Sequence, residues 1–384
     1  MNNAPVRVHF DMQFIGIHCG MGTYETELAL RLMKYDDLNI TASYFLPSGE
    51  NRHTGQFNFP VKRVKIPTPL VYNALPVSKR RIIHAIEKPI FWMMRPFLSY
   101  NSMVRNTGDN VYVFFENRIP VVPVKGKIIA VIHDVRSLRL DEKNKYREII
   151  TRVNTEDIIR KADLIITVSE FTKKELIDIF RVDRARIEVV YNGVDVSAFS
   201  GEYDVSKYGL PEKYILYFGS CDKHKNVESL VKSYALLPSD LRQEYPLVIT
   251  NPSDSVKACA ESCGVSGQVQ YLYRVPDVDK VGIYRGASLF VWPSLYEGFG
   301  IPILEAQASG VPVVSSNAGV MPEVTGDSAV LADPKDTESI ASAIQRVLTD
   351  EALHSDLVMK GFENIKRFSW DESAQKLHDI ITSL

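Results

Sequence analysis

The sequence predicts an α/β protein with two doubly wound parallel sheets, in two domains that face each other across a cleft. Short apolar runs alternate with longer amphipathic stretches in both halves of the chain, which is typical of βαβ units. The length of 384 residues exceeds what one hydrophobic core usually organises. Polar and turn-forming residues interrupt the alternation near residues 196–212, so we expect the link between the domains there.

The first half contains segments that predict strands, because each is short, apolar and rich in β-branched or aromatic residues. They are residues 6–10, 111–115, 127–132, 164–168 and 187–191. Apolar residues at three- and four-residue spacing predict helices at residues 155–162 and 170–180. This alternation favours a parallel sheet covered by helices.

The second half repeats the pattern, with a helix at residues 226–237. Its predicted strands are residues 214–218, 247–250, 269–272, 289–292 and 312–316. We therefore predict a first domain at residues 1–200, a second at 201–365, and a final helix at 366–384 that packs back on the first domain. Such sheets bind ligands at the carboxyl ends of their strands, so the loops there are expected to line the cleft.

Composition excludes several classes of protein. Hydrophobic residues make up 45% and charged residues 24% of the chain, as in folded globular proteins. The net charge of -2 gives no overall field that would attract nucleic acid. No apolar run approaches the roughly 20 residues of a membrane helix, and residues 1–10 do not resemble an export signal. We expect a cytoplasmic protein.

The cysteines do not indicate a disulfide framework or a metal site. Cys19, Cys221, Cys259 and Cys263 are few and scattered for a chain of this size. Cys259 and Cys263 are close in sequence, but no second Cys or His pair stands at zinc-site spacing. We expect reduced thiols and no bound metal.

The densest motif of the chain is PSLYEGFGIPILEAQASG, residues 293–310. It follows a predicted strand and precedes a helix opened by Pro302, a residue suited to the first helical position. Gly298 and Gly300 would let backbone amides approach a ligand closely. The amides and the positive dipole at the start of that helix predict a phosphate site.

Two glutamates flank this predicted phosphate site. Glu297 lies in the loop before the helix, and Glu305 lies about one turn into it. Carboxylates accept hydrogen bonds from adjacent hydroxyls, so an anion site beside them suits a sugar nucleotide. The alternative is a capped surface helix with solvated glutamates.

The motif matches the E-x7-E pattern of retaining glycosyltransferases with the GT-B fold, and the chain resembles family 4 in particular. Further segments match that family in order, at residues 20–32, 131–135, 167–176, 189–195, 217–231, 319–334 and 368–370. The resemblance implies two Rossmann-like domains, an acceptor side at 1–200 and a nucleotide-sugar side at 201–365. It also implies transfer without a metal and with retention of anomeric configuration.

The resemblance assigns roles in the second domain. Glu305 would hold the ribose hydroxyls of the donor, and Glu297 would lie near the transferred sugar. Backbone amides around Phe299, Gly300 and Ile301 would contact sugar and phosphate. Lys225 would neutralise the diphosphate leaving group, which the chemistry also demands. The alternative for Lys225 is a solvated surface lysine.

One loop departs from the family pattern. Many relatives have an arginine directly after the glycine that corresponds to Gly219, or directly before the lysine. Here Ser220 and His224 occupy those positions. Either His224 is protonated when the donor binds, or Lys225 carries most of the charge, with Lys223 assisting.

The first domain and the base-binding loop complete the predicted site. Gly20 and Gly22 would lie on the loop before the first helix, where phosphates approach closely, although an ordinary βα turn is the alternative. His133 follows a buried strand, and the family uses the matching histidine close to the sugar. The loop 271–276, with Arg274 and Val275, would border the base.

The implied partners are a GDP-, UDP- or dTDP-linked sugar donor and a glycan or lipid-linked oligosaccharide acceptor, as in bacterial surface polysaccharide synthesis such as that of O-antigen. The donor is a substrate, so no separate cofactor is expected. The rivals are a nucleotide-sugar epimerase or phosphorylase of the same fold, and a non-catalytic sensor. A sensor would be expected to have lost the glutamate pair or the lysine, and Glu297, Glu305 and Lys225 are all present.

Two further signals have competing interpretations. Asp277 and Asp279 form a D-x-D pattern that can bind a metal, but at the start of a helix aspartates also cap amides and favour the dipole, which we prefer. Residues 79–97 mix basic and large apolar side chains. They could form a helix on the inner face of a membrane or a packed helix beside the acceptor.

Overall fold

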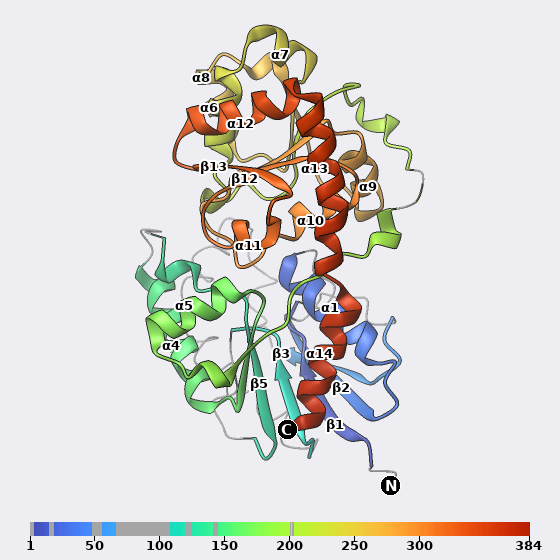
Figure 1. The fold of residues 1–384 in the computed structure, drawn as a ribbon. Coiled ribbons are helices and arrows are strands. Elements are labelled where there is room, and N and C mark those ends of the chain that lie inside the picture. Colours follow the sequence, from blue (N-terminus) through green and yellow to red (C-terminus); the bar gives the residue numbers. More distant parts are fainter. Residues whose placement is uncertain are drawn as a thin grey trace, which may run out of the picture.

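The computed structural model describes residues 4–14, 19–47, 56–66, 108–117, 119, 124–140, 145–199, 201 and 203–384. The chain forms two α/β domains, each built around a parallel sheet with flanking helices, as Figure 1 shows. The predicted fold class is therefore confirmed. Residues 79–97, for which a membrane or acceptor-side helix is predicted, lie outside the described residues.

The first sheet has seven strands in the order β3-β2-β1-β4-β5-β6-β7. All neighbouring strands are parallel. The strands are β1 (Val6–Asp11), β2 (Leu38–Pro47), β3 (Val61–Ile66), β4 (Val111–Phe114), β5 (Lys127–Ile132), β6 (Leu164–Thr167) and β7 (Ile187–Val189). The described helices of this domain are α1 (Gly20–Leu32), α4 (Lys145–Lys161) and α5 (Glu170–Phe180).

The second sheet has six parallel strands in the order β10-β9-β8-β11-β12-β13. The strands are β8 (Ile215–Tyr217), β9 (Leu247–Thr250), β10 (Val269–Leu272), β11 (Leu289–Trp292), β12 (Val313–Ser316) and β13 (Ala329–Ala332). The helices that follow β8 are α6 (Val227–Leu236), α7 (Ser239–Glu244), α8 (Asp254–Ser262), α9 (Asp277–Arg285), α10 (Ile301–Ala308), α11 (Met321–Thr325), α12 (Thr337–Thr349), α13 (Glu351–Asn364) and α14 (Trp370–Ser383). Short 3₁₀ helices occur at Arg136–Leu138, Arg184–Arg186, Val196–Phe199, Ser206–Tyr208, Lys223–Lys225, Ser266–Gln268 and Ile365–Arg367.

All of the strands expected from sequence are present, but the prediction missed β2, β3 and β13. Long apolar runs are typical of parallel strands buried on both faces. The missed strand β2 alternates apolar and polar residues, and β3 carries basic residues at a sheet edge, where charged side chains prevent further pairing. β13 is a short strand at one edge of the second sheet.

The final helix α14 lies along the first domain beside α1, as the red ribbon in Figure 1 shows. The Arg31 Nε atom donates to the Asp371 carboxylate at 2.9 Å. The ring of His378 stacks on that of Tyr35 with the centroids 4.2 Å apart. Helix α14 therefore ties the second domain back to the first.

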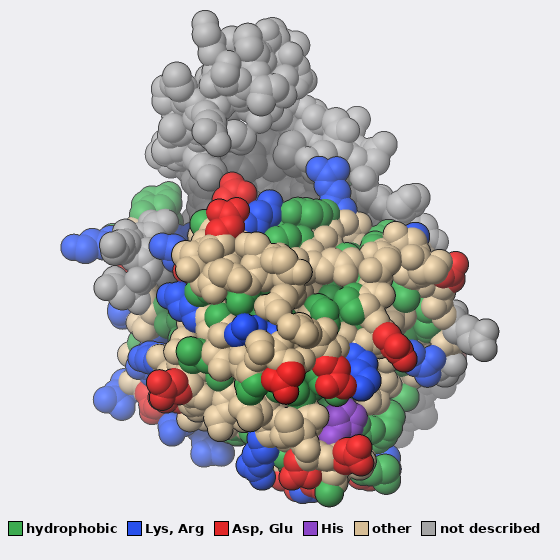
Figure 2. All heavy atoms as spheres, turned by 90° about the horizontal axis from the view of Figure 1, so that it is seen from above, with side chains coloured by type: hydrophobic (Ala, Val, Ile, Leu, Met, Phe, Trp, Pro, Cys, Tyr) green, Lys and Arg blue, Asp and Glu red, His purple; other side chains and the backbone are tan. Residues whose placement is uncertain are grey.

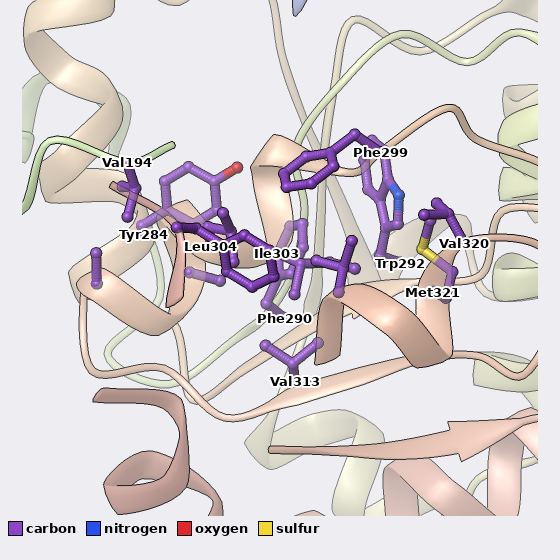
Figure 3. Packing of buried hydrophobic residues seen from close by; sticks show 14 of the residues in the cluster. Val194, Tyr284, Phe290, Trp292, Phe299, Ile303, Leu304, Val313, Val320 and Met321 are labelled. Atoms are coloured by element: carbon purple, nitrogen blue, oxygen red, sulfur yellow. The ribbon is translucent and has the colours of Figure 1, made fainter. Parts of the chain in front are cut away.

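The hydrophobic core of the second domain surrounds β11, the strand that leads into the 293–310 motif. The Trp292 ring at the end of β11 stacks on the Tyr217 ring with the centroids 5.3 Å apart. The Phe299 ring packs edge-on against the Phe368 ring, with the centroids 5.4 Å apart. Figure 3 shows Trp292, Phe299 and Ile303 around this core. Burying each such side chain contributes about 1.5–3 kcal/mol. Trp292, directly before the motif, and Phe299, within it, therefore both anchor the motif in the core.

The surface of the second domain carries mixed charge. Figure 2 shows the end of the molecule formed by this domain, where basic and acidic side chains are interspersed. None of the helices in the described part of the chain combines the length and the apolar character that crossing a membrane requires.

Candidate active site

The 293–310 motif connects β11 to α10. Helix α10 begins at Ile301 with Pro302 in its first turn, as predicted. Gly300 has φ +124°, a backbone conformation that strongly favours glycine, and a Cβ there would lie 3.3 Å from the Met321 Cε atom. The loop therefore turns sharply and directs the start of α10 towards the cleft side of the sheet, where anions are stabilised by helix amides.

Lys225 and Glu297 are brought together as an ion pair. The Lys225 Nζ atom lies 2.7 and 2.8 Å from the two Glu297 carboxylate oxygens, and Ser294 Oγ donates to one of them at 2.7 Å. The exposed fractions of the two side chains are only 17% and 12%. The ammonium also lies 4.8 Å from the centroid of the Trp292 ring. Lys225 is thus held in a fixed position, so the solvated-lysine alternative does not describe it.

Glu305 is held by side chains of helix α9. Lys280 Nζ lies 2.5 Å from one carboxylate oxygen, and the Tyr284 hydroxyl donates to the other at 3.1 Å. Burial, together with the Glu305 charge, raises the pKa of Tyr284 well above its usual value, so its hydroxyl stays a donor. Lys280 was not predicted as a site residue, because in sequence it is only a cation within a helix.

His224 is neutral and meets a cation from the other domain. The Arg136 Nη1 atom lies 2.9 Å from His224 Nε2. Burial, followed by the charges of Arg136 and Lys225, lowers the pKa of His224 to about 3. His224 is therefore neutral in the protein without donor, and its protonation when the donor binds remains a prediction.

The loop after β8 is fixed by packing. The Gly219 amide donates to Thr250 Oγ1 at 2.8 Å, and a Cβ at Gly219 would lie 3.0 Å from the Trp292 ring. Ser220 Oγ donates to the Asp222 carboxylate at 2.8 Å. Ser220 therefore supplies no positive charge beside Lys225, as its sequence position led us to expect.

The predicted base loop contains an unusual backbone conformation. Arg274 has φ +51° and Asn251 has φ +46°, both in the left-handed region. The Arg274 amide donates to the Asn251 side-chain oxygen at 3.1 Å, which links the ends of β9 and β10. Val275, the next residue, is half-buried. Such strained residues cluster at ligand sites, and these lie at the carboxyl edge of the sheet.

His133 lies at the end of β5 and is buried. Its Nε2 atom donates to the Phe115 carbonyl at 2.9 Å, because a carbonyl oxygen can only accept. Burial lowers its pKa, so the ring is neutral. The Tyr24 ring packs edge-on against it at 5.2 Å. Its predicted catalytic role remains a prediction.

Gly20 and Gly22 lie within helix α1, not on the loop before it as predicted. The helix begins at Gly20 because Cys19 acts as its N-cap, with Sγ accepting from the Gly22 amide at 3.4 Å. The sequence offered no standard capping residue there, which is why the helix start was placed too late.

The two domains touch directly at the 293–310 motif. A Cβ at Gly298 would lie 2.2 Å from the His133 carbonyl oxygen, so only glycine permits this approach. Ser169 Oγ donates to the Gly298 carbonyl at 2.9 Å. The Tyr296 hydroxyl donates to the Glu175 carboxylate on α5. The motif is therefore part of the contact between the domains.

Glu323 forms a second connection across the domains. Its two carboxylate oxygens accept the backbone amides of Glu170 and Phe171, each at 2.8 Å. These amides open helix α5, so the carboxylate caps a helix of the other domain and complements its dipole. Sequence reasoning missed this contact, because the partners are far apart in the chain.

The D-x-D pattern serves a structural purpose at Asp279. Its carboxylate accepts from Lys207 Nζ at 2.7 Å and from the Tyr208 hydroxyl at 2.6 Å. Asp277 and Asp279 lie in the first turn of helix α9, where their charge suits the helix dipole, but the N-cap position is Pro276 and carries no side-chain cap, so the capping part of the interpretation is wrong. Among the described residues, no group of three or more His, Cys, Asp or Glu side chains is placed to hold a metal ion.

Two family models match the chain: Glycosyltransferase Family 4 over residues 119–198 and Glycosyl transferases group 1 over residues 204–364. The O-antigen chain mannosyltransferase B of Escherichia coli is 30% identical over 375 residues, covering 92% of this chain and 93% of that protein.

Two solved structures share the fold. WaaG, a glycosyltransferase involved in lipopolysaccharide biosynthesis, superposes with a TM-score of 0.73 and 16% identity, covering 98% of this chain and 99% of that one. HepE of Anabaena, in complex with UDP and glucose, also gives 0.73 and 16%, covering 99% and 100%. The sequence motifs, the paired parallel sheets and these matches together show that the chain belongs to the family 4 glycosyltransferases and has the GT-B fold.

Proposed function

We propose that this glycosyltransferase moves a mannosyl residue from GDP-mannose to a glycan or lipid-linked glycan acceptor in the synthesis of a bacterial surface polysaccharide. The observation that carries the proposal is the half-buried Lys225–Glu297 pair beside the start of α10. The choice of sugar is supported by the Escherichia coli relative, which is named an O-antigen chain mannosyltransferase. Contact with a membrane through residues 79–97 remains part of the proposal.

The donor would lie along the carboxyl edge of the second sheet. Glu305 would accept the ribose hydroxyls, a role supported by its fixed position between Lys280 and Tyr284. The diphosphate would lie near the first amides of α10 and Lys225, because both stabilise negative charge. The base would border Arg274 and Val275, where the chain already adopts a specialised turn.

The chemical step breaks the bond between the anomeric carbon and the phosphate oxygen. Negative charge then develops on the leaving diphosphate, where Lys225 and the helix amides stabilise it without a metal. The acceptor hydroxyl attacks the anomeric carbon from the same face, and its proton passes to the leaving phosphate oxygen. The products are a glycoside of retained configuration and GDP. Glu297 orients Lys225 and the sugar and forms no covalent bond in this scheme.

A donor panel tests the substrate. GDP-mannose, UDP-glucose and dTDP-rhamnose are compared by thermal shift, because a ligand that binds the folded state raises the apparent melting temperature. We expect the largest shift with GDP-mannose. Transfer is then followed as GDP released only when an acceptor glycan is present, which separates transfer from epimerisation. A larger shift with UDP-glucose would overturn the assignment of the donor.

Site variants test the residues. We expect Lys225→Ala and Glu305→Ala each to lower kcat/KM about 100-fold or more, because each removes a charged contact with the donor. Lys366→Ala is the matched control. Like Lys225, this lysine pairs with a glutamate, Glu363, but both side chains are exposed. Near-normal transfer by both site variants would sink the site assignment. Activity lost with a chelator and restored by a divalent ion would contradict metal-independent transfer.

A further inference from the structure

The contact between Arg136 and His224 joins the two domains. Arg136 begins the short 3₁₀ helix that follows β5, and its backbone amide donates to the Asp134 carboxylate at 2.9 Å. Its Nη1 atom is 2.9 Å from His224 Nε2. A guanidinium can only donate, so this nitrogen of His224 accepts and the ring proton is on Nδ1. The neutral ring therefore positions a cation from the first domain.

His224 itself belongs to the donor side. It directly precedes Lys225, and its carbonyl accepts the Leu295 amide at 2.8 Å, which ties it to the loop of the 293–310 motif. The guanidinium of Arg136 is consequently held beside the segment that contains Lys225 and Glu297.

The electrostatic surroundings of His224 are positive. Besides burial, the charges of Arg136, Lys225 and Arg147 all lower its pKa, while Asp222 acts in the opposite direction. Positive potential at a half-enclosed point between two domains favours an anion. Lys225 already shares its charge with Glu297 at 2.7 Å. A leaving diphosphate, which gains charge as the bond breaks, requires more than this one shared cation.

We propose that Arg136 is the second cation of the donor site and contacts the β-phosphate of the nucleotide beside Lys225. This inference rests on the proposed function. The neutral His224 adds no positive charge beside Lys225, and Arg136 brings a guanidinium from the first domain to within 2.9 Å of its ring. Because it belongs to the first domain, the phosphate site is complete only when the domains are closed. Donor binding and closure are thereby coupled.

The test compares GDP and GMP binding by calorimetry. GMP lacks the β-phosphate, so the two probes separate a phosphate contact from general damage. We expect Arg136→Gln to weaken GDP binding about 10- to 100-fold, the usual effect of losing a charge-assisted hydrogen bond. GMP binding should change by less than about threefold. The kcat should also fall, because the contact strengthens as the leaving group gains charge.

A rescue variant makes the role of the guanidinium specific. The double variant Arg136→Gln with His224→Arg places an arginine directly before Lys225, and we expect it to recover GDP affinity to within about fivefold of wild type. Arg160→Gln, an exposed residue of α4, is the matched control and should bind GDP normally. Thermal unfolding confirms that each variant is folded.

The possible outcomes separate this inference from the proposed function. If Lys225→Ala leaves GDP binding unchanged, the proposed function fails together with the inference. If Lys225→Ala weakens GDP binding and Arg136→Gln does not, only the inference fails. Equal losses of GDP and GMP binding in Arg136→Gln, or no rescue by His224→Arg, would show that Arg136 merely supports the domain contact and would also overturn it.

Discussion

The two faces of the cleft are built in different ways. On the second domain, the site side chains pair within their own domain, as Lys225 does with Glu297 and Lys280 does with Glu305. On the first domain, two groups at the interface pair with the second domain instead. Arg136 meets His224, and the start of α5 meets Glu323. The side chains of one half are therefore held within their own domain, and those of the other half are held by contacts between the domains.

This difference predicts that nucleotide binding and sugar transfer depend on different contacts. In the proposed site, the second domain supplies the contacts to the base, the ribose and the first phosphate. If Arg136 contacts the leaving group as proposed, the reaction requires the first domain to be in place as well. An enclosed site also keeps water from competing with the acceptor hydroxyl. Changes at the domain contact should therefore affect transfer more than the binding of GMP, which lacks the β-phosphate.

The largest expected effect is that of Gly298→Ala. The new Cβ would lie 2.2 Å from the His133 carbonyl oxygen, so the domains must separate. We expect transfer to fall about 100-fold or more, since a displacement of about 1 Å has that effect on a reacting pair. GMP binding, which needs the second domain alone, should be unchanged. Steady-state kinetics and calorimetry measure the two quantities.

Gly267→Ala is the control for that variant, because a Cβ at Gly267 meets no atom within 4 Å. If Gly298→Ala keeps transfer within about tenfold of wild type, the closed contact is not required for chemistry. The comparison between the two faces would then be wrong.

An intermediate effect is expected from Glu323→Ala. The variant leaves the Glu170 and Phe171 amides without their acceptor, and losing a helix cap costs about 0.5–2 kcal/mol. Closure should therefore weaken about 2- to 30-fold, with a matching fall in kcat. Hydrogen exchange of these two amides should accelerate.

Asp336→Ala removes a comparable cap inside the second domain, where Asp336 accepts the Glu338 amide at 2.9 Å. It should leave transfer unchanged, although it loosens its own helix. Equal losses of transfer in Glu323→Ala and Asp336→Ala would mean that the effect comes from general destabilisation rather than from the contact between the domains.

The smallest effect concerns pH. The folded-state pKa of His224 is lowered to about 3 from the ordinary value of 6.5, so the folded protein binds fewer protons than the unfolded chain between these values. The contribution of His224 therefore lowers the free energy of unfolding as the pH falls below 6.5. His224→Gln, which keeps an acceptor for Arg136, should lose less unfolding free energy than wild type between about pH 7 and about pH 5.

Transfer rates provide the second measurement on the same variant. The ratio of the rates of His224→Gln and wild type should stay constant within about twofold over that range, because the neutral ring acts only as an acceptor. A wild-type rate that rises on acidification, with the rise absent from the variant, would show that protonated His224 serves the reaction.

Local patterns determined much of this protein. Short apolar runs predicted the strands that are buried on both faces. The spacing of Glu297, Gly300 and Glu305 around Pro302 predicted a strand, a loop and a helix start, and all three are present. These features depend on neighbours within about two turns of chain, so sequence spacing alone specifies them. The strand β3 was missed because its basic residues interrupt the apolar run, which a strand at a sheet edge does not require.

The tertiary structure decided which groups meet across the cleft. Arg136 and His224 are 88 residues apart, and Glu170 and Glu323 are 153 residues apart. Nothing in the spacing of either segment indicates its partner, because the contact depends on how two separately folded sheets are oriented. The same packing buries His224 among cations and so decides that it is neutral. The sequence determined the motif at the edge of the second sheet, and only the arrangement of the domains determined which residues of the first domain meet it.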